Sequence, residues 1–134
     1  MSLWKVFDIA GASMSAQSVR LNTTASNLAN ANTVAGRPED VYQARHPVFE
    51  TVLIQAGHAG VAVREIHQEQ AEPLARYQPG HPLADEQGYV YAPRVDVVEA
   101  MADMLSASRS YQSSLDMMST TKDLLQRTLE TGRG

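Results

Sequence analysis

The 134-residue sequence contains no cysteine. Disulfide bonds, thiolate metal ligands and a cysteine nucleophile are therefore excluded, whereas reducing and oxidising compartments are both permitted. Basic residues are also few, because 11 Lys and Arg stand against 15 Asp and Glu, with a net charge of −4. No run of basic residues forms a patch, and this balance argues against nucleic acid as a partner.

Long apolar runs are missing as well. No stretch of the sequence has the length and apolar character of a transmembrane helix, so we expect no membrane span. Lys5 and Asp8 interrupt the N-terminus before the apolar region of a signal peptide could build up. We therefore expect that any export of this protein uses a route without a cleaved signal peptide.

The last third of the chain has neither Gly nor Pro between Val97 and Leu129. Mostly apolar side chains recur there in steps of four and three residues, the spacing of a helix packed against other helices. The positions are Val97, Met101, Met104, Ser108, Tyr111, Leu115, Met118, Lys122, Leu125 and Leu129. Such a helix would be roughly 50 Å long, so we expect a long partner beside it. The other faces carry mostly Ser and Thr, which suit close packing against further protein.

The N-terminal segment repeats this spacing over a similar length. Its stripe is Leu3, Phe7, Ala10, Met14, Gln17, Leu21, Thr24 and Leu28. We predict that the two terminal helices pair as an antiparallel coiled coil. Many Asn, Ser and Thr residues lower the intrinsic helix propensity of the N-terminal segment, so we expect it to be helical only when packed.

The middle of the chain, residues 34–93, holds most of the prolines and glycines and several short β-rich runs. We predict strands at residues 41–46, 48–54, 61–67 and 88–91, a hairpin connection at 57–60, and a loop at 77–85 with a turn at Pro79-Gly80. Pro47 indicates an edge strand or a bulge. The predicted fold is thus mainly α with a small β-rich middle segment, divided into residues 1–33, 34–93 and 94–134.

Four histidines in the middle segment raise the alternative of a metal or acid–base site. They are His46, His58, His67 and His81, with Glu65, Glu69 and Asp85 nearby in sequence. None has the spacing of a known site, such as two His four apart on a helix with a Glu between them. The Ser-rich helix lacks the G-x-S-x-G turn of a hydrolase nucleophile. We therefore predict no catalytic residue, no metal and no cofactor.

The stretch Ala25-Ser26-Asn27-Leu28-Ala29-Asn30-Ala31-Asn32-Thr33 is similar to the N-terminal signature of the axial proteins of the bacterial flagellum, the rod and hook group. Residues 77–85, 88–90, 95–99 and 106–112 resemble the proximal-rod members of that family. The resemblance covers nearly the whole chain.

This resemblance implies a structural subunit of the flagellar basal body, and not an enzyme. Its helices would pack with those of other subunits into a tube that crosses the periplasm, surrounds the export channel and carries torque. The implied partners are other copies, related rod subunits, hook–basal-body adaptor and MS-ring-associated proteins, and the flagellar type III export machinery.

The side chains expected to serve assembly and helix packing lie in the two terminal segments. They are Phe7, Met14, Leu21, Asn27, Leu28, Asn30, Val97, Met101, Met104, Tyr111, Leu115, Met118, Leu125 and Leu129. For Asn27 and Asn30 we favour hydrogen bonds to neighbouring subunits over a role as helix C-cap residues. Two alternatives stay open, a coiled-coil subunit of another secretion apparatus and a small hydrolase or metal-binding domain that uses the histidines.

Overall fold

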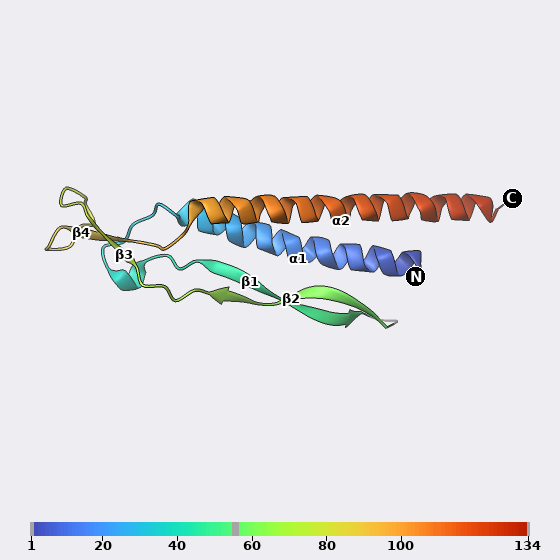
Figure 1. The fold of residues 1–134 in the computed structure, drawn as a ribbon, viewed down its shortest axis with the longest axis horizontal. Helices are drawn as coiled ribbons and strands as arrows, with labels where there is room; N and C mark the ends of the chain where they lie inside the picture. Colours follow the sequence, from blue (N-terminus) through green and yellow to red (C-terminus); the bar gives the residue numbers. More distant parts are fainter. Residues whose placement is uncertain (1, 55–56, 134) are drawn as a thin grey trace.

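The computed structural model describes residues 2–54 and 57–133 as two long helices with two small antiparallel sheets between them in sequence. The elements are α1 (Leu3–Asn30), the short 3-10 helix η1 (Pro38–Asp40), β1 (Arg45–Ile54), β2 (His58–Gln68), β3 (Leu74–Tyr77), β4 (Tyr89–Ala92) and α2 (Val97–Thr131). Figure 1 shows α1 and α2 side by side and running in opposite directions, with the β1–β2 hairpin along the other side of α1. The long part of the molecule therefore has three layers, with α1 in the middle.

Both predicted helices are present, and each begins at a polar N-cap. The Ser2 hydroxyl accepts a hydrogen bond from the Trp4 backbone N–H at 3.3 Å, and the Asp96 carboxylate accepts one from the Glu99 N–H at 3.0 Å. α2 continues without a break to Gly132, whose N–H bonds to the Thr128 carbonyl at 3.0 Å. The absence of Gly and Pro inside it explains its unusual length.

The hairpin of β1 and β2 differs from the prediction at both strands. Residues 41–44 are not in a strand, and the two strands predicted at 41–46 and 48–54 are one strand, β1, that begins at Arg45. β2 is longer than the predicted 61–67, because it begins at His58, inside the connection predicted at 57–60; residues 55–56 lie outside the described part. The register shifts between Val48 and Phe49, which pair with Glu65 and Val63. Pro47 thus stands beside a bulge in a two-stranded sheet, and this confirms the expectation of an edge or a bulge.

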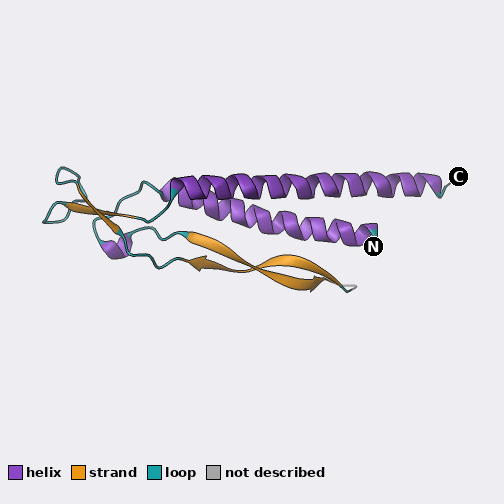
Figure 2. Ribbon diagram, viewed as in Figure 1, coloured by secondary structure: helices purple, strands orange, loops and turns teal. Residues whose placement is uncertain are grey.

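A second, smaller sheet closes the end of the molecule where α1 ends and α2 begins (Figure 2). Its strand β3 was not predicted, because four residues that pair only with distant β4 carry little local signal. The loop after β3 and its turn at Pro79-Gly80 are confirmed, and the His81 N–H closes that turn on the Gln78 carbonyl at 3.0 Å.

The buried core of the described residues consists of small side chains. Ala10 and Ala16 on α1 and Ala107 on α2 are at most 2% exposed, and the largest side chain under 2% exposure is Val90. Outside the helices, Val41, Ala44 and Ala92 are buried as well. Because large apolar side chains contribute most of the hydrophobic stabilisation, this core gives the isolated chain little stability.

Candidate functional site

The contact between α1 and α2 is built from small residues that let the two backbones approach closely. The buried positions on α2 are Ala107, Ser114 and Thr121, each seven residues after the last. The Ser114 hydroxyl donates to the Ser13 hydroxyl at 2.9 Å. A methyl group on Gly11 would lie 3.5 Å from the terminal carbon of Met118.

The stripe predicted on α1 lies where the sequence indicated. All eight of its positions are buried or half-buried, including Phe7, Met14, Leu21 and Leu28. α1 is covered on a second side by the hairpin, since a methyl group on Gly60 would lie 3.6 Å from the Cβ of Ala12. The β1–β2 hairpin is therefore packed along the N-terminal helix.

The stripe predicted on α2 does not lie wholly against α1. Met104, Tyr111, Met118 and Leu125 are half-buried, whereas Val97, Met101, Ser108, Leu115, Lys122 and Leu129 are exposed. The residues buried between the four half-buried positions are the small ones, because only small side chains fit where the helices come closest. A role of the exposed positions in packing against other subunits stays a prediction.

Large apolar side chains gather on the first two turns of α2, on the side away from α1. Val98, Met101 and Leu105 are 77%, 55% and 66% exposed, and Ala102 lies among them. We call these four residues the outer patch of α2. Their spacing places them on one helix face, and a cluster of exposed apolar side chains marks an interaction site more often than scattered single ones do.

A polar cluster ties the two helices together beside this patch. The Arg20 guanidinium donates to Asp103 Oδ1 from Nε at 3.0 Å and also from Nη2, and the Thr24 hydroxyl donates to Oδ2 at 2.9 Å. These hydrogen bonds hold the pKa of the Asp103 carboxyl below its ordinary value, and the bond from Arg20 has the largest effect. Sequence reasoning missed this pair, although Asp103 is one of only three charges between Met101 and Thr121.

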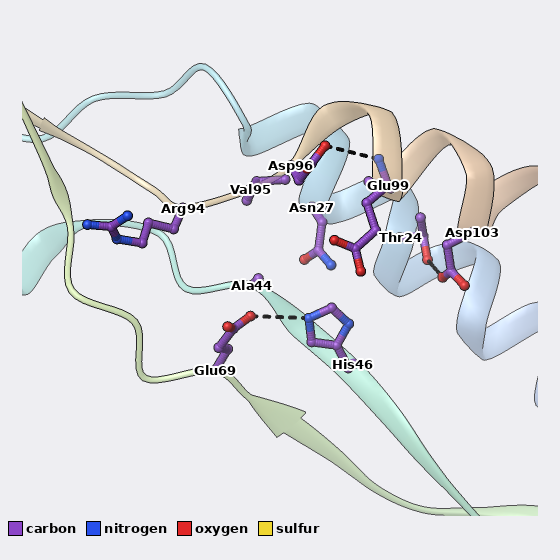
Figure 3. Close-up of a pocket in the computed structure, with 11 residues that line it drawn as sticks. Thr24, Asn27, Ala44, His46, Glu69, Arg94, Val95, Asp96, Glu99 and Asp103 are labelled. Carbon is purple, nitrogen blue, oxygen red and sulfur yellow. Dashed lines mark hydrogen bonds and ion pairs between the residues drawn. The ribbon is translucent and has the colours of Figure 1, made fainter.

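Next to the cluster is a cavity of about 310 Å³ between the end of α1, the start of α2 and the base of the hairpin (Figure 3). His46 and Glu69 face each other across it, with 3.4 Å between Nε2 and Oε2. Both side chains are at least half exposed, so this ion pair contributes little stability. In the described part of the chain, no three His, Asp or Glu side chains are grouped closely enough to hold a metal ion.

None of the other histidines lines this cavity, and each has its own local neighbours. His58, near the far end of the hairpin, has its Nε2 3.7 Å from Asp8 Oδ2. His67 lies opposite His46 in the β1–β2 ladder. The Nδ1 of His81 accepts a hydrogen bond from the Leu83 N–H at 3.0 Å inside its loop. The histidines therefore do not form one site.

Asn27 fixes the entry of β1 onto α1. Its amide donates to the Arg45 carbonyl at 2.8 Å and accepts from the Arg45 N–H at 2.9 Å, and the Tyr42 hydroxyl donates to its oxygen at 2.8 Å. These bonds lie within one chain, and the expected hydrogen bonds of Asn27 to a neighbouring subunit stay a prediction. The Asn30 amide donates to the Ser26 carbonyl of its own helix at 2.9 Å. The Tyr42 hydroxyl was not foreseen as a partner.

Asp85 organises the loop between β3 and β4. Its Oδ1 accepts from the backbone N–H groups of Gln87 and Tyr89, both at 2.9 Å, and its Oδ2 accepts from the Tyr91 hydroxyl at 3.0 Å. The Tyr89 N–H is the main reason why the pKa of Asp85 is lowered, and Asp85 in turn raises the pKa of Tyr91. The Tyr77 and Tyr89 rings meet edge to face with centroids 5.4 Å apart.

The chain exposes more surface than a compact protein of its mass. Its accessible surface is 9060 Å², whereas a compact monomer of 14.6 kDa exposes about 6,900 Å². The difference, roughly 2,000 Å², exceeds the ~800 Å² that one partner contributes to a standard interface. No helix in the part of the chain that the structure describes could span a membrane.

Two family models match the sequence at its two ends. Residues 7–36 match the model described as "Flagella basal body rod protein", and residues 86–131 match "Flagellar basal body rod FlgEFG protein C-terminal". These segments contain most of α1 and of α2.

Curated relatives match over nearly the whole length. The chain is 47% identical to the flagellar basal-body rod protein FlgC of Yersinia enterocolitica over 135 residues, which cover 99% of this chain and 100% of the relative. It is 46% identical to FlgC of Salmonella typhimurium with the same coverage. Identity to FlgC of Aquifex aeolicus is 40%, over 97% of each chain.

Proposed function

Because the chain belongs to the FlgC family of flagellar basal-body rod proteins and is a structural subunit of that rod, not an enzyme, we propose that α1 and α2 form its axial part and pack against neighbouring subunits. The single observation that carries this proposal is the outer patch of α2, whose large apolar side chains are uncovered in the chain by itself. Water exposure of these side chains is unfavourable, and a neighbouring subunit would relieve it.

The finer assignment is the proximal part of the rod, in the periplasm. There, copies of this chain and related rod subunits would surround the export channel and transmit torque from the motor to the hook. The proposed contacts at the base and along the rod are MS-ring-associated proteins and the hook–basal-body adaptor. Delivery would be by the flagellar type III machinery without a cleaved signal peptide.

Coiled-coil packing between helices of the tube is part of this proposal. α1 and α2 run in opposite directions, and the residues buried on α2 repeat every seven positions. A repeat of seven favours helices that wind gently around each other. The exposed positions Met101, Ser108, Leu115, Lys122 and Leu129 also repeat every seven and supply a second seam for a helix of another subunit.

The test is complementation of cells that lack this chain, with Leu115→Asp compared with His81→Ala. Leu115 is 39% exposed, so an Asp there is hydrated in the free chain and becomes costly only when a neighbour covers it. Among the described residues, the side chain of His81 forms a hydrogen bond only with the Leu83 N–H of its own loop. We expect Leu115→Asp cells to export the protein but not to swim, and His81→Ala cells to swim.

Secretion of both variants, checked by immunoblot, controls for a failure of export. Basal bodies isolated from the complemented cells should contain the wild-type chain by mass spectrometry. Full motility of Leu115→Asp cells would remove the second seam from the proposal, and absence of the wild-type chain from basal bodies would contradict the proposal as a whole.

A further inference from the structure

The β1–β2 hairpin presents a second uncovered apolar face. Its inner side lies on α1, because Gly60 approaches Ala12 and His58 approaches Asp8. Successive side chains of a strand alternate between the two sides, so the opposite side carries the cross-strand pairs in between. These six residues, the hairpin outer face, are Phe49 with Val63, Thr51 with Val61, and Leu53 with Ala59.

No residue of the hairpin outer face is charged, and its two largest side chains are exposed, whereas Val61 and Val63 are half-buried. Leu53 is 84% exposed and Phe49 is 37% exposed. Thr51 and Ala59 are exposed as well. A two-stranded sheet is stable only when it packs against something, and in this chain α1 covers one of its two sides.

The hairpin outer face and the outer patch of α2 lie on opposite sides of the molecule. The hairpin and α2 flank α1 from its two sides (Figure 1), and each of the two surfaces points away from α1. Both surfaces are uncharged, so their contact avoids the repulsion between chains of net charge −4. Their lengths also match, since residues 98–105 of α2 span about 11 Å and residues 49–53 of β1 span about 14 Å.

The small size of the hairpin outer face decides between two kinds of contact. Five residues on each of two strands form a strip only about 17 Å long and about 10 Å wide, which is too small to supply the ~800 Å² of accessible surface that each partner of a stable dimer contributes. Two hairpins stacked on each other would therefore form a weak dimer and leave the outer patch of α2 uncovered. A contact between the two different surfaces covers both, and it repeats from copy to copy around a ring or along a helix.

We propose that the hairpin outer face of one copy packs against the outer patch of α2 of the next copy, an inference that rests on the proposed function of the chain as a rod subunit. Each copy then takes part in two such contacts, one through each surface. The contact joins neighbours in the assembled rod, where further contacts hold them in place, and is too small to join two copies in dilute solution.

The absence of cysteine makes disulfide cross-linking a direct test. The variant Thr51→Cys/Leu105→Cys carries one thiol on each surface and should, after mild oxidation of isolated basal bodies, give a ladder of multimers of this chain on a non-reducing gel. Thr51→Cys/Ala102→Cys is a second pair in case the loss of Leu105 impairs assembly. The matched control is Thr51→Cys/Ser119→Cys, because Ser119 lies near the same helix face but about 21 Å further along.

The ladder from either test pair, with monomer from the control, supports the proposal. Basal bodies that contain the double variants but show no ladder overturn it and leave the proposed function intact. Dimers from Thr51→Cys alone overturn it in favour of stacked hairpins, and a ladder from the control overturns the stated register. Basal bodies without the wild-type chain overturn the proposed function and this inference together.

Discussion

Asp103 on α2 forms an ion pair with Arg20 on α1. Arg20 and then Thr24 hold the pKa of its carboxyl below the usual value near 3.9. A carboxyl whose pKa is lowered by folding stabilises the folded chain at pH values above the unfolded value. This stabilisation is fully present above about pH 4 and is lost as the pH falls through the lowered value.

We expect Asp103→Asn to weaken the pairing of α1 and α2 by about 1–2 kcal/mol, because Arg20 then remains half-buried without its anion. Circular dichroism of the free chain should show less helix at pH 7. The variant should also lose the part of the acid-induced drop in helix content that Asp103 causes. Asp116→Asn is the matched control, since Asp116 is exposed and its carboxylate, within the described part of the chain, accepts a hydrogen bond only from Gln112 on its own helix. An equal effect in both variants would contradict the role of the Arg20 pair.

Gly88 is the residue that the loop between β3 and β4 requires to be glycine. Its φ is +87°, and an added Cβ would lie 2.9 Å from a Tyr77 ring carbon. Left-handed backbone costs an L residue roughly 1–2 kcal/mol even without a clash. We expect Gly88→Ala to speed hydrogen exchange at Val90 by about tenfold, since 1.4 kcal/mol corresponds to that factor. Gly80→Ala, where the added Cβ meets open space, should leave this exchange unchanged.

Among the elements, α1 and α2 are held close together by the face that α2 presents to α1. That face is centred on Ala107, Ser114 and Thr121, so the short distance between the helices depends on small side chains. We expect Ala107→Leu to overpack the contact and to cost about 1–3 kcal/mol. Helix content of the free chain measures it, with Ala102→Leu as control because Ala102 is exposed. A loss of helix in Ala102→Leu equal to that in Ala107→Leu would show that the size of the added side chain, not its place, matters.

The existence of both helices was predictable from this sequence. Of the face that α2 presents to α1, only part was predictable. The ends of α2 follow from Asp96, Gly132 and the uninterrupted run between them, all of which are local signals. The buried face was predicted through Met101 and Leu115, since a stripe of large apolar residues usually faces the nearest partner. This rule does not say whether the stripe faces a helix of the same chain or a helix of another subunit. In this chain the small residues of α2 face α1.

The polar contacts between residues far apart in the sequence could not be predicted, for a different reason. Arg20 and Asp103 are 83 positions apart, and Asn27 meets Arg45 through backbone atoms that any residue possesses. Neither pairing leaves a periodic trace in one sequence. The hairpin was predictable in its runs of β-branched residues, but its register depends on the bulge at Val48 and Phe49, which no local turn signal specifies.

At the scale of the whole molecule, the core and the surface of the chain both indicate that the isolated chain has low stability. Most of the buried apolar side chains are alanine, and the accessible surface of 9060 Å² is larger than the ~6,900 Å² of a compact monomer. Ordering the backbone costs about 1–2 kcal/mol per residue, which small buried side chains offset poorly. The structure with both helices fully formed is thus expected to depend on the neighbours that cover the outer patch of α2 and the hairpin outer face.

We therefore predict that the free monomer exchanges its amide hydrogens rapidly in residues up to about 30 and beyond about 100, and slowly only after assembly. Hydrogen exchange with mass spectrometry on a verified monomer and on isolated basal bodies compares the two states. Val41, Ala44, Val90 and Ala92 provide an internal reference, because these residues outside the helices are buried within the chain and should change less than the helices. Strong protection along α1 and α2 in the monomer would show that the intrachain contacts, chiefly the Arg20–Asp103 pair and the alanine contact between the helices, hold the fold without neighbours.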